Sequence, residues 1–519
     1  MNTAAFRAQW GKMGRDEIRR AQGDLLGRYL RDHVVPFSAY YREVFRANKL
    51  DPRQFRSLED LQRLPFIDKT FLMNTPEHPQ RVREFALIPD QAVLAKQGRV
   101  IRSAIFHGKA ATRAALNREY RPVFLTSTTG RSAEPVSFLF TQYDLENLIL
   151  TGRHIISVLG ATEEDRIINM FPYSPHLAFW QTHYATTYST IFCVSTGGGK
   201  VMGTEGNIRL LNKVKPAAII GMPTFLYHLL TIALEEGHRC ESLRMLVLGG
   251  EKVPDGMRQK LRELAMELGA KNVDVLATYG FTEAKAAWAE CPFPHDGTPG
   301  GYHLTPELSA IEIIDPDTGQ VQPDGAPGEI VFSALDHRGT VVLRYRTGDC
   351  TDGGLVYEPC QHCKRSLPRI VGNISRKSNR MELRLDKIKG TLVDFNELEH
   401  ALDDCASIGA WQLELRKLHD NPLELDELIL HAEKRCDDED SLVVRQLNDR
   451  FSAVTELRLN DVEFHDAAEM RRRQGVGTEL KEKRIVDNRP HDGKPAPPRV
   501  RHERRERPHR LSERRTETL

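Results

Sequence analysis

A short loop between two apolar runs carries residues suited to holding phosphate. The loop lies in FLTSTTGRSAEPVSFLFT (124–141), and its candidate residues are Thr126, Ser127, Thr128, Thr129 and Gly130. Hydroxyl groups donate hydrogen bonds, and glycine adopts φ > 0 without steric cost, so successive backbone N–H groups can turn toward an anion. The same composition is typical of ordinary turns. The loop alone therefore does not predict a phosphate site, and other motifs in the chain must support that interpretation.

A second group of polar and aromatic residues follows runs that are typical of buried strands. Apolar runs at 216–223, 243–251 and 273–283 alternate with helical patterns, which predicts a parallel sheet covered on both faces. Ligands in such sheets bind beyond the carboxyl ends of the strands. The residues expected at those ends are Gly249, Gly250, Glu251, Tyr279, Gly280, Thr282 and Glu283.

The order of several segments resembles the adenylate-forming superfamily of acyl- and aryl-CoA synthetases, and most closely its phenylacetate-CoA ligase-like branch. After the Ser/Thr/Gly loop come YGFTE (279–283), YRTGD (345–349), PRIVG (368–372) and the lysine-bearing LKEKR (480–484). The resemblance implies an α/β fold: a large N-terminal domain with mostly parallel sheets flanked by helices, and a small mobile α+β C-terminal domain. The boundaries expected are a helical segment 1–75, an AMP-binding domain 76–375, a small domain 376–489 and a disordered basic tail 490–519.

Adenylation of a carboxylate needs a purine seat, a ribose clamp, donors for the triphosphate and a divalent cation. The resemblance implies that Tyr279 stacks on adenine, Thr282 contacts the phosphoryl group, Glu283 holds Mg²⁺ and Asp349 accepts both ribose hydroxyls of ATP. The alternatives are a packed aromatic for Tyr279 and a turn residue for Asp349. Arg369 and Arg376, within or just after PRIVG, complete the expected cofactor-binding set.

Lys481 is the expected catalytic ammonium, because ELKEKRIVDNR (479–489) resembles the closing segment of the phenylacetate-CoA ligases; Lys483 is its competitor. Two positions depart from the family pattern. Ser127 stands where the loop normally has its first glycine, and the hinge reads Gly372-Asn373 where Gly-Arg is usual. Either Arg376 reaches the nucleotide in its place, or the C-terminal domain pivots differently.

Aromatic and polar residues after the run RIINM (166–170) suit an acyl pocket, which needs apolar walls with a few polar groups. A plain core would use the same residues. The pocket residues predicted are Tyr173, His176, Phe179 and Trp180.

The cysteines predict a separate metal site. Cys360 and Cys363 form a CxxC pair, and Cys291 and His303 lie upstream, which is a common arrangement for a closed tetrahedral zinc site. His295 and His362 are alternative nitrogen ligands, and two buried thiols with a surface CxxC are the alternative without metal. The role expected is structural, since four protein ligands leave no open position.

Composition sets the remaining expectations. The 73 Lys and Arg residues balance 72 Asp and Glu residues, so the chain shows no general bias toward nucleic acid. No apolar run is long enough to span a bilayer and the start lacks a secretory pattern, which predicts a cytoplasmic protein. The oligomeric state stays open, a dimer included.

The function expected is ATP-dependent activation of a carboxylic acid, aryl or medium to long and apolar, with transfer to coenzyme A. Two alternatives remain: acyl transfer to an acyl-carrier protein or another protein, and a nucleotide-binding homologue with impaired turnover, which Ser127 and Asn373 motivate.

Overall fold

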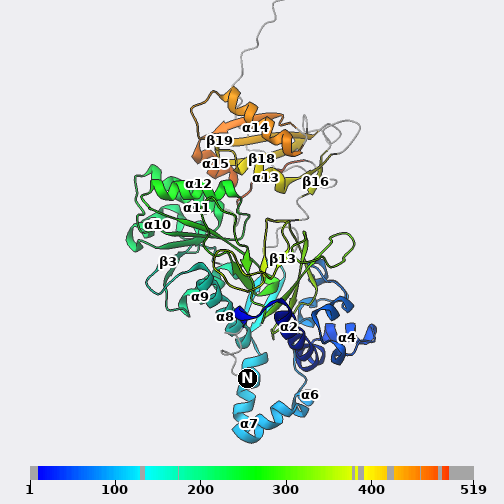
Figure 1. Cartoon of the computed structure of the whole chain (residues 1–519). Helices are drawn as coiled ribbons and strands as arrows, with labels where there is room; N and C mark the ends of the chain where they lie inside the picture. Colours follow the sequence, from blue (N-terminus) through cyan, green and yellow to red (C-terminus); the bar gives the residue numbers. More distant parts are fainter. Residues whose placement is uncertain are drawn as a thin grey trace, which may run out of the picture.

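The computed structural model describes residues 10–128, 135–173, 175–376, 380–383, 391–417, 426–455, 458–476 and 482–489. Thr129, Gly130 and Lys481 of the predicted site, and the predicted tail 490–519, lie outside these residues. Figure 1 shows three parts: N-terminal helices at one end, a central body of sheets, and a C-terminal unit at the opposite end.

A six-stranded sheet forms one half of the central body, in the order β4-β3-β5-β6-β7-β8. Its first five strands run parallel and β8 pairs antiparallel with β7. The strands are β3 (Arg166–Asn169), β4 (Phe192–Ser195), β5 (Ala218–Gly221), β6 (Met245–Leu248), β7 (Asp274–Phe281) and β8 (Ala286–Ala289). β5 and β6 are buried along their whole length, as the continuous apolar runs predict. The predicted parallel sheet is therefore confirmed.

Helices connect these strands where the sequence pattern places them. They are α8 (Gln142–Leu159), α9 (Leu177–Thr187), α10 (Gly199–Val214), α11 (Pro223–Glu235) and α12 (Asp255–Glu267). Local chemistry sets their ends: a capping box between Thr141 and Asp144 starts α8, and Gly160 at φ 69° ends it. Pro223 occupies the first turn of α11, where its missing N–H has no helical partner to lose.

The other half of the body is antiparallel. Its main sheet has the order β10-β11-β12-β15, beside a three-stranded sheet β13-β14-β9 and a hairpin of β1 and β2. The bounds are β1 (Pro122–Ser127), β2 (Ser137–Thr141), β9 (Tyr302–His303), β10 (Ser309–Ile314), β11 (Gly328–Ala334), β12 (Tyr345–Thr351), β13 (Leu355–Val356), β14 (Arg369–Ile370) and β15 (Ile374–Arg376). A register shift between β11 and β12 falls at the TGD turn, and the pairing of β12 with β15 sets Asp349 opposite Arg376.

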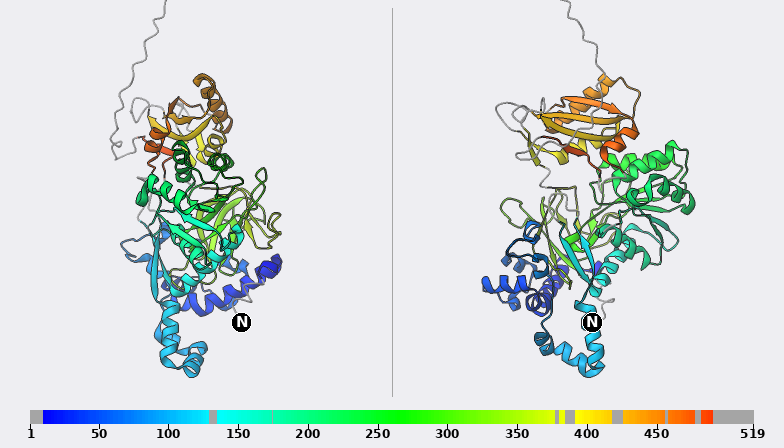
Figure 2. Two further views of the ribbon diagram at one scale, coloured as in Figure 1. Left: turned by 90° about the vertical axis from the view of Figure 1, so that its left-hand side faces the viewer. Right: turned by 180° about the vertical axis from the view of Figure 1, so that it is seen from behind.

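Helices form the described N-terminal part. They are η1 (Trp10–Lys12), α2 (Arg15–Tyr29), η2 (Leu30–Val34), α3 (Val35–Phe37), α4 (Ala39–Ala47), η3 (Pro52–Gln54), η4 (Leu58–Arg63) and η5 (Thr70–Leu72), followed by α5 (Arg81–Glu84), α6 (Gln91–Lys96) and α7 (Gly98–Tyr120). Leu26, Tyr29 and Leu30 are buried in the core. α6 and α7 project away from the body in all views (Figures 1 and 2).

The C-terminal unit is α+β. Its main sheet has the order β20-β19-β18-β21. Its elements are β16 (Arg380–Leu383), β17 (Thr391–Asp394), α13 (Phe395–Asp403), β18 (Ile408–Lys417), β19 (Asp426–Lys434), α14 (Asp440–Thr455), β20 (Asp461–His465), α15 (Ala467–Gln474) and β21 (Ile485–Asp487).

The C-terminal unit rests on α11 and α12 of the body (Figure 1). Tyr227 on α11 donates its hydroxyl proton to Glu433 at 3.1 Å, and Nε2 of the neighbouring His228 lies 2.6 Å from Oε1 of Gln474 on α15. Gly256 at the start of α12 donates its backbone N–H to Asp404 at 2.9 Å. Within the described part of the chain, we find no helix with the length and apolar character needed to cross a bilayer.

Candidate active site

Two of the sequence motifs meet at one carboxylate. The Tyr279 hydroxyl donates to Oδ2 of Asp349 at 3.0 Å, and the Arg376 guanidinium lies 2.8 Å from Oδ1. The TGD turn itself sets the carboxylate, since Gly348 has φ 73° and the Asp349 N–H donates to Oγ1 of Thr347 at 3.0 Å. The predicted Tyr279, Asp349 and Arg376 therefore converge.

Glu283 adds a second acidic group at the same place. It lies in the short helix η6 (Thr282–Ala284) that follows β7, and its Oε1 accepts the Tyr345 hydroxyl proton at 2.7 Å. Burial raises the pKa of Glu283, with Tyr345 and Arg376 opposing the rise. Tyr345 belongs to the YRTGD motif but was not predicted as a site residue. Its contact with Glu283 depends on the tertiary structure, which the local sequence does not indicate.

Tyr279 is packed as well as hydrogen-bonded. Its ring centroid lies 5.7 Å from those of Phe281 and Tyr302 and 6.2 Å from that of Trp288. Burial beside the Asp349 carboxylate raises the pKa of Tyr279 well above its usual value, so the phenol stays protonated and remains a donor. The structure thus gives Tyr279 a role in fixing Asp349 that the sequence did not indicate.

The described residues of the predicted phosphate loop, Thr126 to Thr128, lie at the end of the β1–β2 hairpin. Thr128 exchanges hydrogen bonds with Val136, through its N–H to the carbonyl and through Oγ1 from the Val136 N–H, both at 3.0 Å. The Ser127 N–H donates to the Pro175 carbonyl at 2.6 Å. The Thr126 hydroxyl is buried and makes no hydrogen bond with any described residue.

The glycines after β6 allow close backbone approach. A β-carbon at Gly249 would come within 2.4 Å of Oγ1 of Thr278, and Gly250 has φ 80°. Glu251, by contrast, accepts the Thr224 hydroxyl proton at 2.8 Å and the Thr224 N–H at 3.2 Å. Its carboxylate therefore caps the first turn of α11.

Arg369 also has a local role. Its guanidinium is buried and donates to the carbonyls of Gly300 and of Glu358, the latter at 2.9 Å. These carbonyls belong to the two segments that carry the predicted metal ligands. Arg369 ties those segments together.

The predicted acyl-pocket residues form an aromatic cluster on and before α9. Tyr173 lies edge-on to Phe179 with ring centroids 5.1 Å apart, and Trp180 lies 5.3 Å from Phe179 and 5.1 Å from Phe124 of β1. Tyr173 is 61% exposed while Phe179 is buried. His176, directly before α9, is half-buried. The cluster connects the hairpin of the phosphate loop to the parallel sheet.

The four predicted zinc ligands come together. The ligand atoms of Cys291, His303, Cys360 and Cys363 all lie within 4.8 Å of one another. Sγ of Cys291 lies 3.7 Å from Sγ of Cys360, and Nε2 of His303 lies 3.1 Å from Sγ of Cys363. His303 also turns Nδ1 toward the Ala289 carbonyl at 3.4 Å, which leaves Nε2 for a metal.

The surroundings of this cluster fit a soft metal ion. A β-carbon at Gly300 would lie 2.8 Å from Sγ of Cys360, so glycine is needed for the loop to pass. The alternative ligand His362 instead places Nε2 3.0 Å from the Thr298 carbonyl. Three thiolates and one imidazole are a donor set typical of structural zinc.

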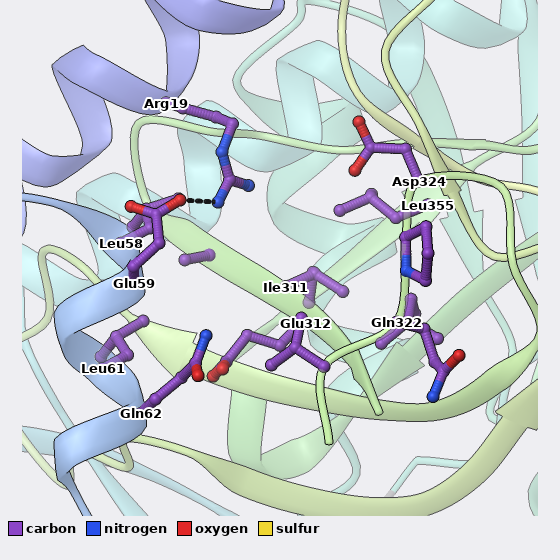
Figure 3. A pocket seen from close by; sticks show the side chains of 14 residues that line it. Arg19, Leu58, Glu59, Leu61, Gln62, Ile311, Glu312, Gln322, Asp324 and Leu355 are labelled. Carbon is purple, nitrogen blue, oxygen red and sulfur yellow. Dashed lines mark hydrogen bonds and ion pairs between the residues drawn. The ribbon is translucent and has the colours of Figure 1, made fainter. Parts of the chain in front are cut away.

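A separate pocket lies between η4 and β10 (Figure 3). Arg19 and Glu59 form an ion pair at its edge, with nitrogen and oxygen 2.5 Å apart, and Ile311 and Leu355 contribute apolar walls. None of the predicted site residues lines this pocket. It is therefore distinct from the Tyr279–Asp349 site.

Comparison with known proteins relates this chain to adenylate-forming enzymes. The family model described as AMP-binding enzyme matches residues 135–335. The phenylacetate-coenzyme A ligase of Thermus thermophilus is 26% identical over 73% of this chain and 75% of its own length. That of Escherichia coli is 25% identical over 85% of this chain and 89% of its own length.

Among solved structures, a 2-hydroxyisobutyryl-CoA ligase in its postadenylation state covers 93% of this chain and 92% of its own, with a TM-score of 0.72 and 20% identity. At that identity the likeness shows the fold. The chain is thus similar to members of the adenylate-forming superfamily, among them phenylacetate-coenzyme A ligases.

Proposed function

We propose that this protein is an AMP-forming acid–thiol ligase. A carboxylate oxygen attacks the α-phosphorus of ATP, pyrophosphate leaves, and the acyl adenylate then passes its acyl group to the thiol of coenzyme A with release of AMP. The convergence of Tyr279, Asp349 and Arg376 carries the proposal, because it joins residues of separate adenylation motifs around one buried carboxylate. The family relationship supports the same reaction.

Each part of the site has a task in this reaction. Asp349, with two carboxylate oxygens, accepts the ribose hydroxyls, and Tyr279 and Arg376 hold it in place. Thr282 donates to the phosphoryl group. Glu283 is an oxygen donor of the kind that Mg²⁺ prefers, and the bound cation would neutralise charge on the phosphates. Lys481 supplies the positive charge beside the reacting phosphorus.

The aromatic cluster supports an apolar acid. Tyr173, Phe179 and Trp180 give a wall of rings beside the hairpin that leads into the phosphate loop. Such walls contact aryl groups or hydrocarbon chains, with His176 available as a polar group. We propose an aryl or a medium to long apolar carboxylic acid as substrate.

The Cys291, His303, Cys360 and Cys363 cluster is proposed to hold structural Zn²⁺. All eight cysteines of the chain are free of disulfides, and thiolate ligands persist best in a reducing compartment. We therefore propose a cytoplasmic location.

Pyrophosphate release from ATP, measured across a panel of aryl and fatty acids, tests the proposed function. Acid-dependent release, followed by thioester formation only when coenzyme A is added, is the expected result. Thioester formation only with an acyl-carrier protein would move the acceptor to a protein. Absence of release across the panel, with ATP bound, would overturn the proposed ligase activity.

A further inference from the structure

Two histidines and a glutamate meet on the sheet of the C-terminal unit, away from the site described above. Nδ1 of His431 lies 3.1 Å from Nε2 of His465 and 3.3 Å from Oε2 of Glu463, and Nε2 of His465 lies 3.6 Å from the same oxygen. Ligand atoms about 2.0–2.1 Å from a tetrahedral zinc ion lie about 3.3–3.4 Å from one another. The triangle formed by these three atoms therefore has the size of one face of such a site.

The strand register brings these residues together. β19 and β20 are parallel neighbours in which His431 pairs with Glu463. Side chains alternate between the faces of a strand, so Glu463 and His465, two positions apart, lie on the same face. The arrangement is built on two strands of a sheet, which position ligands more rigidly than loops do.

A second carboxylate orients the buried histidine. Nε2 of His431 lies 3.0 Å from Oε2 of Glu414 on β18, and Oε1 of Glu414 accepts a hydrogen bond from the Asn488 side chain at 2.8 Å. A histidine that donates one ring N–H to a carboxylate presents its other nitrogen to a metal, and this pairing is the usual support of zinc-bound histidine. Glu414 thus fixes Nδ1 of His431 as the ligand atom.

We propose that His431, Glu463 and His465 form a second zinc site, with Nδ1, a carboxylate oxygen and Nε2 as its ligands. Two neutral imidazoles and a carboxylate suit Zn²⁺. Among the described residues three side chains supply ligand atoms, so water or an added ligand completes the tetrahedron. His431 is buried while Glu463 is 43% exposed, which gives the ion a path from solvent.

The charges around the cluster are compatible with a divalent cation. Glu414 and Glu463 carry negative charge; the Arg473 guanidinium lies 4.0 Å from Glu463, and the charge of Arg416 acts on Glu414. Without a metal, Nε2 of His431 faces the Glu414 carboxylate and Nδ1 faces the Glu463 carboxylate. Burial lowers the pKa of His431, but Glu414 and Glu463 outweigh that and hold it above its usual value. A protonated His431 is therefore the rival state.

The position of the site suggests what the metal does. β20 leads directly into α15, whose last residue, Gln474, contacts His228 of the body. A metal bound to β19 and β20 would fix the strand from which α15 starts. We expect the ion to stabilise the C-terminal unit in contact with α11, independently of the proposed ligase chemistry.

Zinc binding to the full-length chain tests the proposal without any activity assay. The protein is stripped with a chelator and titrated with Zn²⁺, and with Co²⁺ as a spectroscopic probe. We expect one equivalent of Co²⁺ that gives visible d–d absorption without thiolate charge transfer, separate from any equivalent bound by cysteines. A titration in which all bound Co²⁺ shows thiolate charge transfer would overturn the proposal.

Matched variants assign the equivalent to these residues. Glu463→Gln and His465→Gln each keep the side chain polar and are expected to lose the thiolate-free equivalent. Glu414→Gln should weaken it by about 10- to 100-fold through the orientation of His431. His238→Gln is the control, because His238 also pairs with a glutamate, Glu236, at 3.1 Å but has no second histidine.

The alternative outcomes are decisive. If Glu463→Gln, His465→Gln and wild type bind the same equivalents with the same spectra, the cluster binds no metal and the proposal is overturned. If a variant fails to fold, the wild-type Co²⁺ spectrum still decides, since it must contain the thiolate-free equivalent. Ligase turnover enters neither readout, so failure of the proposed function leaves this result intact.

Discussion

The phenolic oxygen of Tyr279 and Oδ2 of Asp349 lie 3.0 Å apart, although 70 positions separate the two residues in the chain. Tyr279 lies near the end of β7 in the parallel-rich sheet, whereas Asp349 lies within β12 of the antiparallel sheet. Their hydrogen bond therefore joins the two halves of the body at the candidate site. Arg376, opposite Asp349 on β15, completes the contact.

Asp349→Asn should weaken ATP binding and lower acid-dependent pyrophosphate release by about 10- to 100-fold, because hydrogen bonds to a charged group contribute about 1.5–3 kcal/mol. Tyr279→Phe, which keeps the ring, should have a smaller effect of about 10-fold or less. Calorimetric titration with ATP and the release assay measure both. Asp324→Asn, in an ion pair with Arg15 outside the site, is the control. Unchanged ATP affinity in a folded Asp349→Asn protein would contradict the ribose-binding role.

Lys481→Ala should reduce the rate of acid-dependent pyrophosphate release by about 10²- to 10³-fold, the usual effect of removing one group that stabilises developing charge. ATP binding should change much less, since the lysine acts mainly in the transition state. Lys483→Ala, two positions away, is the matched comparison and should retain most of the rate. The reverse order of effects would assign the catalytic role to Lys483.

Several features follow from the sequence because they depend on local pattern or scarce chemistry. Continuous apolar runs give β5, β6 and β7, and the spacing of Cys291, His303, Cys360 and Cys363 indicates a cluster that the structure brings together. Cysteines and histidines at such spacings usually bind metal, so their pattern is a specific indication of a metal site.

Other features depend on hydrogen-bond partners that the local sequence pattern does not predict. Glu251 follows the glycine turn as expected, yet its carboxylate caps α11 through Thr224. Arg369 lies in a family motif, but backbone carbonyls of Gly300 and Glu358 take its donors. Which acceptor a side chain finds is set by tertiary packing, and the His431, Glu463 and His465 triangle depends in the same way on the register of two strands.

Cys363→Ser should remove zinc from the four-residue cluster and lower the stability of the protein. If the wild-type site is saturated at about 100 times its dissociation constant, losing it costs about 2.7 kcal/mol. Metal content by elemental analysis and denaturant unfolding measure the two effects. Cys193→Ser, at a half-buried cysteine outside the cluster, should change neither. Because four protein ligands leave no open position, adenylation by the folded variant should persist, and its loss would indicate a catalytic metal.

Lys285→Met should destabilise the fold strongly, because Asp144 is a fully buried carboxylate that needs its partners. Oδ2 of Asp144 lies 3.2 Å from the Lys285 ammonium and accepts the backbone N–H groups of Thr141 and Gly339 at 3.0 and 2.7 Å. Removing one partner of a buried ion pair costs about 3–5 kcal/mol. The double variant Asp144→Asn, Lys285→Met should recover part of that loss, since it leaves no unpaired charge.

The ion pair of Asp144 and Lys285 also predicts how the stability of the protein depends on pH. Burial alone would raise the pKa of Asp144, but Lys285, His337 and the Thr141 N–H hold it well below its usual range. The ionised carboxylate therefore adds stability above its unfolded-state pKa of about 3.9, and that stability is lost as the pH falls below this value. Urea unfolding at a series of pH values should show the gap between wild type and Lys285→Met narrowing in acid. A gap that stays constant or widens below the unfolded-state pKa would contradict a native ion pair at Asp144.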